Sequence, residues 1–547
     1  MPHAGPAQDW VARTAAAVTA EAERRHPGEA ATCASGISPS GPVHLGNLRE
    51  MMTPHLVADE VRRSGHPCRH ILSWDDYDRF RRVPAGFPER FAEHVGRPLT
   101  SVPDPAGGCH ENWAEHFKDP LRESLARLGI RVTEISQTQM YTSGAYTQQI
   151  ILAMRRRAGI GAILRRYQAK RAGAEEGTQG TRGYYPFRPY CATCGRDGTA
   201  VTAFDDGTTE ISYTCTCGAI TGPVPIGQVR GKLVWKVDWP MRWACERVTF
   251  EPAGVDHASP GSSFTVGRHL VEDIFGGEMP LHFGYSFVGT QGSAKMSGSA
   301  GGAPTPQDAL EIFEAPLVRW LYARRRPEQA ITLAFGAEVG RVYDEWDALT
   351  RKVSDGTAEP GARVIYTRAS STADGKLPQT PRPVQFRALA SVFDIAAGDE
   401  EQELRILRDL TPEAPVNSLS EVRPRLDCAR AWMLGYAPDE ARTTVREEPD
   451  RRLLASLTEQ DRHALKLLVD QMAGHWALGG LTTLLYGIPK LIRGLPVDAP
   501  PTPDLKAAQR TWFVLLYRLL IGKDTGPRLP TLLLALGQER VRVLLGA

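Results

Sequence analysis

Residues 31–47 read ATCASGISPSGPVHLGN, and this stretch decides the fold of the N-terminal part of the chain. Ala31–Ile37 is a short apolar run, which predicts a buried strand. The small residues at 38–42 predict a turn, and from His44 onward apolar residues recur at helical spacing. Arg69–Ser73 predicts a second strand. A strand, a helix and another strand in this order imply a right-handed crossover and a parallel sheet. We therefore expect an α/β, Rossmann-like domain.

Two polar segments follow these strands, at the sheet edge where parallel sheets bind ligands. One is WDDYDRFR at 74–81. The other holds His44 and Asn47, which share one face of the first helical turn. A helix N-terminus attracts anions, so both side chains could donate hydrogen bonds to phosphate oxygens, and Gly46 would let a flat adenine approach the backbone. The alternative is an ordinary helix N-terminus with a capping histidine.

A second candidate phosphate site lies in the Gly- and Ser-rich segment 289–302, after a strand predicted at His282–Val288. It contains Lys295-Met296-Ser297-Gly298-Ser299. A flexible loop of this composition can close over a triphosphate, and Lys295 would place positive charge where negative charge develops at the α-phosphate. The alternative is a surface loop with one solvated lysine.

Four of the nine cysteines cluster as Cys191-x-x-Cys194 and Cys215-x-Cys217. Four thiolates suit a tetrahedral zinc ion, although the second pair is tighter than the usual C-x-x-C. Because four protein ligands leave no open position, we expect a structural zinc site. The other five cysteines are interpreted as incidental thiols, and the alternative for the cluster is four unligated thiols.

Composition limits the class of protein. The 547 residues are 42% hydrophobic and 23% charged, which excludes collagen-like, mostly disordered and disulfide-framework proteins. No apolar run reaches the roughly 18 residues of a membrane helix, and Met1-Pro2-His3 does not begin a secretory signal. We therefore expect a cytoplasmic protein with no membrane partner. The balance of 65 basic and 63 acidic residues argues against binding to nucleic acid by overall charge.

The segment His44-Leu45-Gly46-Asn47 after the first strand, paired with KMSGS after the last, resembles the two signature motifs of class I aminoacyl-tRNA synthetases. More narrowly, the chain is similar to the archaeal-type class I lysyl-tRNA synthetases. The segments that carry this resemblance span nearly the whole chain. They are GISPSG at 36–41, HLGNLRE at 44–50, WDDYDRFR at 74–81, VDWPMRW at 237–243, FEPAG at 250–254 with Asp256-His257, KMSGS at 295–299, and 512–529.

The resemblance implies that L-lysine is attached to tRNA(Lys) through a lysyl-adenylate, with ATP as substrate and Mg²⁺ as its companion ion. It implies four catalytic residues: His44, Asn47, Lys295 and Ser297. It implies that ATP is bound by Pro39, His44, Gly46, Asn47, Lys295, Met296, Ser297 and Ser299. It implies that lysine is bound by Gly36, Ser38, Asp75, Asp76, Trp235, Asp238, His257 and Tyr285.

The chemistry of the last group supports it. Lysine brings two ammonium groups into a partly dry pocket, and each needs a partner. The carboxylates at 75, 76 and 238 could serve, while Trp235 or Tyr285 could hold the carbon stem and attract the cation. Three departures from the family pattern stand out. Ser38 replaces the usual threonine and could loosen specificity, Pro54 should kink the first helix, and the zinc ligands are all cysteines.

We expect five parts along the chain. They are a first catalytic half at 1–155, a basic and zinc-binding insertion at 156–233, a second catalytic half at 234–303, a helical connecting domain at 304–385, and an α-helical anticodon-binding domain at 386–547. Oligomeric state is left open, with a monomer favoured.

Two basic stretches could contact tRNA phosphates. One includes Arg155, Arg156, Arg157, Arg165, Arg166, Lys170 and Arg171; the other, from Lys490 onward, has nine basic and four acidic residues. Trp512, Phe513, Tyr517 and Arg518 are candidates for reading anticodon bases. Solvated charged faces are the alternative. Two rival functions remain: an amino-acid-activating relative that transfers to another acceptor, and a non-catalytic tRNA-binding relative.

Overall fold

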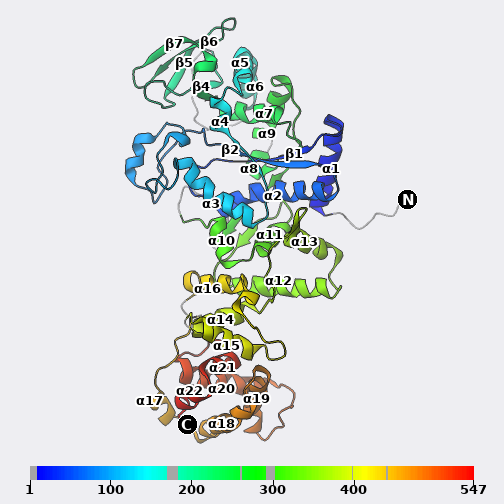
Figure 1. Cartoon of the computed structure of the whole chain (residues 1–547), viewed down its shortest axis with the longest axis vertical. Coiled ribbons are helices and arrows are strands. Elements are labelled where there is room, and N and C mark those ends of the chain that lie inside the picture. The colour runs from blue at the N-terminus through cyan, green and yellow to red at the C-terminus, as the bar shows by residue number, and fades with distance from the viewer. Residues whose placement is uncertain are drawn as a thin grey trace, which may run out of the picture. The chain divides into compact units, whose positions relative to one another are not determined.

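The structure, a computed structural model, describes residues 9–168, 183–258, 262–290, 302–396, 398–438 and 442–546. The chain forms two compact units, coloured along the sequence in Figure 1. The first comprises residues 1–309, 318–333 and 359–377, and the second comprises residues 310–317, 334–358 and 378–547. Among the described residues, no helix is long and apolar enough to cross a membrane.

A parallel sheet forms the centre of the first unit. The strands β1 (Ala31–Ile37), β2 (Cys68–Trp74) and β3 (Thr133–Ser136) lie in the order β1-β2-β3. On the other side of β1, Cys33 pairs in parallel with Phe250, and Phe250 pairs in parallel with Leu281. Segments far apart in the sequence therefore complete one sheet: β1 has β2 on one side and, about 180 residues further along the chain than β2, Phe250 on the other. The predicted α/β parallel fold is confirmed.

Helices cover both faces of this sheet (Figure 1). On one face, β1 packs against α1 (Trp10–Arg25) and α2 (Leu45–Arg63), through a cluster that includes Cys33, Val18 and Val57. On the other face, Ala34 and Ile71 pack against α7 (Trp235–Cys245) and α9 (Ser263–Asp273). Cys33 and Ala34 point to opposite faces because side chains alternate along a strand.

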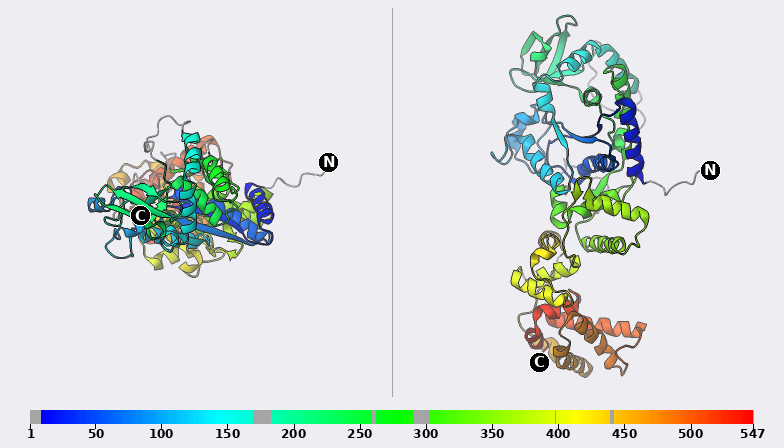
Figure 2. Two further views of the ribbon diagram at one scale, coloured as in Figure 1. Left: turned by 90° about the horizontal axis from the view of Figure 1, so that it is seen from above. Right: turned by 45° about the vertical axis from the view of Figure 1, so that its right-hand side comes forward.

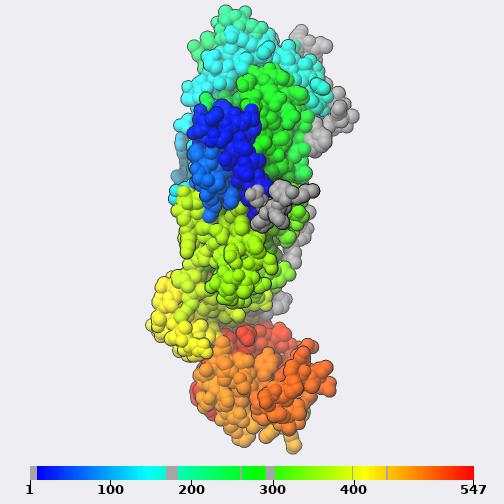
Figure 3. Space-filling model, turned by 90° about the vertical axis from the view of Figure 1, so that its right-hand side faces the viewer, coloured from blue at the N-terminus to red at the C-terminus, as the bar shows by residue number. Residues whose placement is uncertain are grey.

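The helix α1 follows from its own sequence. Asp9 caps it by accepting a hydrogen bond from the Ala12 N–H, and its apolar residues recur at spacings of three and four. In the turned view, the dark blue α1 and α2 lie side by side (Figure 2). Arg25 donates to the carbonyls of Val248 and Met279. The blue surface of α1 accordingly adjoins green atoms from the later half of the same unit (Figure 3).

The helix α2 runs without interruption through Pro54. Proline removes the N–H that would bond to the carbonyl of Glu50, four residues earlier. That carbonyl instead accepts a hydrogen bond of 3.0 Å from Ser35 Oγ on β1. The helix therefore continues past Pro54, and the orphaned carbonyl ties α2 to the strand that leads to the candidate site.

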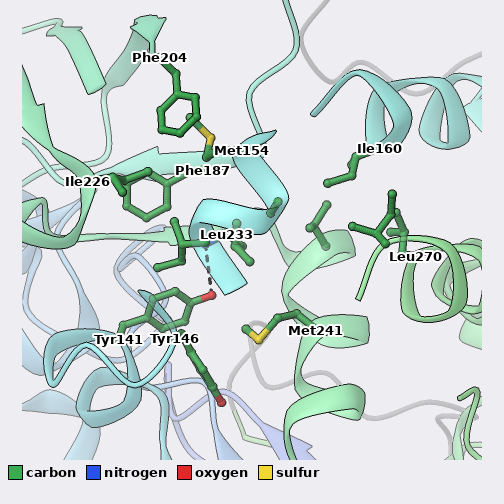
Figure 4. Packing of buried hydrophobic residues seen from close by; sticks show 14 of the residues in the cluster. Tyr141, Tyr146, Met154, Ile160, Phe187, Phe204, Ile226, Leu233, Met241 and Leu270 are labelled. Atoms are coloured by element: carbon green, nitrogen blue, oxygen red, sulfur yellow. Dashed lines mark hydrogen bonds between the residues drawn. The ribbon is translucent and has the colours of Figure 1, made fainter. Parts of the chain in front are cut away.

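An insertion separates β3 from α7. It begins with helices α4 (Gln137–Thr142), α5 (Thr147–Arg155) and α6 (Arg157–Gln168). It continues with β4 (Phe187–Pro189) paired to β8 (Gly231–Leu233), and with the antiparallel sheet of β5 (Thr199–Phe204), β6 (Glu210–Cys215) and β7 (Ile220–Pro225). A single apolar cluster joins them to α7 and α9. Figure 4 shows Tyr141, Phe187, Leu233 and Met241 converging there, with Tyr141 Oη accepting from the Leu233 N–H.

The remaining described helices and strands of the first unit are short or lie at its boundary. They are η1 (Glu89–His94), η2 (Leu99–Ser101), α3 (Trp113–Arg127), η3 (Ile226–Gln228), β9 (Ala253–Gly254), α8 (Val255–Ala258), β10 (Gly284–Tyr285), β11 (Val288–Thr290), α10 (Pro306–Ile312), α11 (Ala315–Ala323), β12 (Ile331–Leu333), α13 (Pro360–Ser370), β13 (Ser371–Thr372) and β14 (Gly375–Lys376).

Two details differ from expectation. The strand predicted at His282–Val288 is broken into β10 and the start of β11, and the connecting segment at 304–385, predicted as helical, contains β12, which pairs in parallel with β11.

Helices make up the regular structure described in the second unit. They are α12 (Val339–Ser354), α14 (Phe386–Ala396), α15 (Glu400–Leu410), η5 (Leu419–Val422), α16 (Arg425–Gly435), α17 (Arg451–Ala455), α18 (Glu459–Gln471), η7 (Met472–His475), α19 (Leu478–Leu491), α20 (Pro503–Ile521), α21 (Leu529–Leu536) and α22 (Gln538–Leu544). Buried Arg425 links them by pairing with Glu314 and Asp347 at 2.8 and 2.9 Å. The predicted helical C-terminal region is confirmed.

Candidate functional site

A cavity of about 620 Å³ lies at the carboxyl ends of β1 and β2. This is where β1 has β2 on one side and residue 250 on the other, the switch point at which such sheets bind ligands. The volume suits small-molecule substrates. The structure brings several predicted residues together in the lining: Gly36, Ser38, His44, Asn47, Asp75, Trp235 and His257.

His44 caps the N-terminus of α2. Its Nδ1 accepts from the Asn47 N–H at 3.3 Å, and Asn47 Oδ1 accepts from the His44 N–H at 3.3 Å. The capping interpretation is therefore correct, but it does not exclude a role at phosphate. With Nδ1 as acceptor, the neutral ring carries its proton on Nε2, and the Asn47 amide retains its N–H donors. Both residues line the cavity beside the helix N-terminus.

Pro39 and Gly46 stand next to these residues in the chain but do not line the cavity themselves. The turn contributes Ser40, Gly41, Pro42 and Val43 instead. The Ser40 carbonyl accepts a hydrogen bond of 3.1 Å from Trp113 Nε1, which fixes one side of the turn.

The helix α7 supplies an aromatic wall. Trp235, Trp239 and Trp243 lie one helical turn apart, and all three line the cavity. The ring centroids of Trp235 and Trp239 are 5.2 Å apart, and His257 lies 5.5 Å from Trp235. Trp235 and His257 were predicted from the sequence, whereas Trp239 was not. Its spacing of four residues from Trp235 was the available signal.

Three carboxylates, which we call the acidic group, line the same cavity: Glu251 is buried, and Glu50 and Asp75 are partly buried. Burial raises the pKa of Glu50 to about 7, and burial raises the pKa of Asp75 to about 6 although Arg242 opposes the rise. Burial also raises the pKa of Glu251. The indole N–H groups of Trp239 and Trp243 donate to Glu251 at 3.0 and 2.5 Å. Sequence reasoning missed Glu50 and Glu251, although both lie in the quoted motifs.

Asp238 is already engaged by protein groups. It is fully buried on α7, accepts a hydrogen bond from Tyr141 Oη, and pairs with Arg242 at 2.9 Å. Arg242 also pairs with Asp75 at 2.9 Å, so one guanidinium joins the end of β2 to α7. Lys232 pairs with Asp78 at 2.5 Å. This network places Asp238 behind the cavity wall, not in the lining.

Asp76 and Tyr285 also lie outside the lining. The buried Asp76 carboxylate is held by Lys118 Nζ at 2.7 Å, Ser136 Oγ at 2.6 Å and the Thr138 N–H at 2.7 Å. It therefore joins β2 to β3 and α3. Tyr285 is buried beside Glu50; burial, and then the Glu50 charge, raise its pKa. The guanidinium of Arg49 lies 5.5 Å from its ring.

The lining also contains exposed basic residues. Arg79, Arg81 and Arg82, which we call the arginine rim, follow β2 and belong to the lining. The site thus joins exposed positive charge near a helix N-terminus to buried negative charge beside aromatic rings. The predicted loop residues Lys295, Met296, Ser297, Gly298 and Ser299 lie outside the described residues.

The four predicted zinc ligands meet in space. Their sulfur atoms lie within 4.8 Å of one another, with Cys191–Cys217 and Cys194–Cys215 each at 3.7 Å. Cys191 and Cys194 flank a turn, and Cys215 ends β6. Burial opposes ionisation of the Cys191 thiol, but the N–H groups of Cys194 and Thr193 lower its pKa to about 6. Four convergent sulfurs, one of them readily ionised, fit a structural zinc ion.

A second cluster of possible metal ligands was missed. Asp104, Cys109, His110 and His116 bring their ligand atoms within 4.8 Å of one another. Asp104 pairs with His116 at 2.9 Å. Although burial opposes it, hydrogen bonds from the N–H groups of Gly108, Ala106 and His110 lower the pKa of Asp104. Cys109 had been interpreted as an incidental thiol. A carboxylate, a thiol and two imidazoles are all groups that zinc accepts.

Residues 8–370 match the family described as "tRNA synthetases class I (K)". The chain belongs to this family. The lysine–tRNA ligase of Streptomyces coelicolor is 56% identical over 98% of both chains. The lysine–tRNA ligase of Pyrococcus horikoshii is 34% identical over 93% of this chain and 94% of that one. The crystal structure of a glutamate tRNA ligase from Elizabethkingia meningosepticum aligns with a TM-score of 0.43 at 12% identity, covering 94% of this chain and 98% of that one.

The residues expected to contact RNA in this class I synthetase differ in exposure, and those in the exposed class are Arg155, Arg156, Arg165, Arg166 and Arg518. Trp512 is buried, Tyr517 Oη donates to the Pro527 carbonyl at 2.6 Å, and Arg518 pairs with Asp524 at 2.6 Å. Phe513 packs edge-on against the half-exposed Tyr486. In the basic insertion, Arg157 pairs with Asp206 at 2.6 Å, while Lys170 and Arg171 lie outside the described residues.

Proposed function

We propose that this synthetase is a lysine–tRNA ligase that activates L-lysine with ATP in the cavity at the ends of β1 and β2. The observation that carries the proposal is a single cavity lined both by donors and arginines and by the acidic group. ATP is an anion and lysine is largely a cation, so the lining offers groups of opposite charge to each of them. The membership of the family and the ligases that the chain resembles agree with this assignment.

ATP binds on the side of α2. The N–H groups of the first helical turn, His44 Nε2 and the Asn47 amide donate to phosphate oxygens. Pro39 and Gly46 shape the turn from behind. We assign to Lys295, Met296, Ser297 and Ser299 the role of covering the triphosphate, as the family resemblance implies. Mg²⁺, when bound with ATP, neutralises part of the triphosphate charge.

Lysine binds between the aromatic wall and the acidic group. Trp235 and His257 contact the carbon stem, with Gly36 and Ser38 at the strand end, while Glu50, Asp75 and Glu251 compensate the two ammonium groups. In the part of the chain that the structure describes, Glu251 has indole donors but no cation within ion-pair distance. Asp76, Asp238 and Tyr285 act on this set from behind, through the contacts given above.

The chemistry is positioning and charge stabilisation. The lysine carboxylate attacks the α-phosphate in line, pyrophosphate leaves, and lysyl-adenylate forms. The terminal adenosine of tRNA(Lys) then attacks the mixed anhydride and releases AMP. No covalent enzyme intermediate is required. The five-part division of the chain remains our proposal, with the helical C-terminal part binding the anticodon.

Zinc would be held by Cys191, Cys194, Cys215 and Cys217, where it would stabilise the turn that they enclose. We infer that a second zinc would be held by Asp104, Cys109, His110 and His116.

Lysine-dependent ATP–pyrophosphate exchange, followed by charging of purified tRNA(Lys), tests the function. We expect both reactions. Exchange without charging would favour a relative that transfers to another acceptor, and the absence of both would favour a non-catalytic tRNA-binding relative.

The role of the loop is tested by Lys295→Ala. We expect exchange to fall about a hundredfold with little loss of stability, because a preorganised charge at the reacting phosphate is lost. Unchanged exchange kinetics would remove Lys295 from the mechanism.

A further inference from the structure

The arginine rim is not a free surface loop. Arg79 follows β2 and lines the cavity, with its side chain 46% exposed. A few residues later, the chain abuts the turn that precedes α2: a Cβ atom placed on Gly41 would lie 3.5 Å from Pro84. The rim therefore borders the turn to which we assign the triphosphate.

The four-cysteine turn contacts the same segment through its backbone. The Asp197 N–H donates to the Gly96 carbonyl at 2.8 Å, and the Gly96 N–H donates to the Phe80 carbonyl at 2.9 Å. Phe80 lies between Arg79 and Arg81 in the chain. Gly96 has φ +91°, and a Cβ there would lie 3.1 Å from Asp197 Oδ1. A glycine at this position thus permits the close approach of the two segments.

One ion pair completes the connection. Arg79 Nη1 lies 3.0 Å from Asp197 Oδ2, and the Asp197 side chain is only 10% exposed. Arg188 approaches the same oxygen at 3.9 Å. Asp197 comes three residues after Cys194, so its position depends on the turn that the cysteines enclose.

We propose that Asp197 is a positioning residue that aims Arg79 at phosphate groups entering the cavity. This rests on the proposed function. An arginine held in one orientation loses less freedom when it binds phosphate, and its planar group can then engage two oxygens. The phosphates belong either to ATP or to the 3′ end of tRNA. The four-cysteine turn thereby contributes to substrate binding as well as to folding.

If the Arg79–Asp197 ion pair had only a structural role, a different result would be expected. Pairs as exposed as Arg79–Asp197 usually contribute little to stability. Loss of Asp197 should then leave substrate affinity unchanged. Positioning instead predicts that loss of Asp197 weakens binding, and that the loss disappears when Arg79 is already absent.

The experiment compares Asp197→Ala, Arg79→Ala and the double variant in the full chain. The KM for ATP is measured by lysine-dependent exchange without tRNA, and the KM for tRNA by charging. Zinc content and the KM for lysine are measured in parallel. The matched control is Glu29→Ala, which removes the carboxylate that pairs with Arg247 at 2.8 Å, away from the cavity lining and from both basic stretches.

We expect Asp197→Ala to raise one of the two KM values about five- to twentyfold, with kcat, zinc content and the KM for lysine nearly unchanged. The substrate affected identifies the source of the phosphate. The double variant should match Arg79→Ala alone, and Asp197→Glu should restore most of the affinity.

The proposal is overturned if both KM values of the Asp197→Ala variant stay within twofold of wild type. It is also overturned if the fold-changes in KM of the two single variants multiply in the double variant. If the Asp197→Ala variant loses its zinc, the test uses the Arg79→Ala variant instead, because that substitution leaves the cysteine turn intact. Unchanged KM values for ATP and tRNA in the Arg79→Ala variant would also overturn the proposal. A wild-type chain without exchange would instead refute the proposed function.

Discussion

At the scale of single residues, the site combines burial with charge. Burial holds the pKa of Glu50 near 7 and that of Asp75 near 6, because a carboxylate loses solvation when it leaves water. These groups cost stability in the absence of a cation and bind one strongly when it arrives. Such a pocket discriminates against uncharged isosteres of lysine, because they would leave the carboxylates without partners.

The Glu50→Gln substitution should weaken the binding of lysine while it stabilises the folded protein. We expect the KM for lysine to rise tenfold or more, because an ammonium loses its partner in a dry site. Thermal stability should rise by on the order of 1 kcal/mol, because a poorly solvated carboxylate is removed. Exchange kinetics and thermal unfolding measure the two effects.

Glu134→Gln is the control, since it makes the same change in a carboxylate that accepts from the indole of Trp74 and lines a different cavity. Equal effects of the two substitutions on the KM for lysine would contradict the role of Glu50.

Lysine affinity should depend on pH. The carboxylates of Glu50 and Asp75 have raised pKa values, so they are ionised above about pH 7 and become protonated as the pH falls through 7 and 6. Only the ionised forms pair with ammonium groups. The KM for lysine should therefore rise as the pH is lowered from 8 to 6, and less steeply in Glu50→Gln.

The same two carboxylates affect folding stability in the opposite direction: they favour the folded state more at low pH than at high pH. A raised folded-state pKa means that the folded protein binds these protons more tightly than the unfolded chain, so this contribution favours folding at low pH and is lost as pH rises toward 7. A KM for lysine that is flat over this range would count against the acidic group.

At the scale of elements, unusual local features are compensated by neighbours. Pro54 leaves the Glu50 carbonyl without a helical donor, and Ser35 on β1 supplies one. The cysteine turn brings four sulfurs together beside the apolar cluster of the insertion, so a bound metal would add to the packing there. The α7 indoles stack upon one another and converge on Glu251.

Metal analysis should find two zinc ions per chain. Cys215→Ser should remove one and His116→Ala the other. Loss of the first should expose β5–β7 to proteolysis while the parallel sheet stays folded, because that sheet has its own cores on both faces. Hydrogen exchange and limited proteolysis measure this. Cys428→Ser, in the second unit, should change neither count. A single zinc that both substitutions remove would contradict two separate sites.

At the scale of the whole molecule, positive and negative charges nearly balance, but basic residues are concentrated in particular stretches of the chain. The chain carries +2, so recognition of RNA depends on where its arginines and lysines lie. Both units contribute basic residues, and a tRNA extends over more surface than one domain offers. The cavity that we propose for lysine activation, in contrast, lies within the first unit.

Salt should therefore affect the two reactions differently. We expect the KM for tRNA in charging to rise steeply as potassium chloride increases from 50 to 200 mM, because phosphate contacts release counterions. Lysine-dependent exchange without tRNA should change only a few-fold. Equal salt sensitivity of both reactions would indicate that the basic stretches do not bind tRNA.

The sequence by itself determined the strand–turn–helix at 31–47, the parallel sheet, the four-cysteine cluster and the family resemblance. These features depend on residues that are close together in the sequence. The spacing of hydrophobic residues, turn residues and metal ligands can therefore predict them. It also predicted that His44, Asn47 and Asp75 share one edge, because the ends of parallel strands meet there, and the family resemblance added Trp235 and His257.

Only the tertiary structure decided which carboxylates face the cavity. Asp75 and Asp76 are neighbours in sequence, yet one lines the cavity and the other is held by Lys118. Glu50 and Glu251 are 201 residues apart in number and act on one site, which no local pattern reveals. The second metal cluster and the contact of Asp197 with Arg79 were hidden likewise. Their effects depend on burial and on distances across elements, which hydrophobic patterning along the chain does not encode.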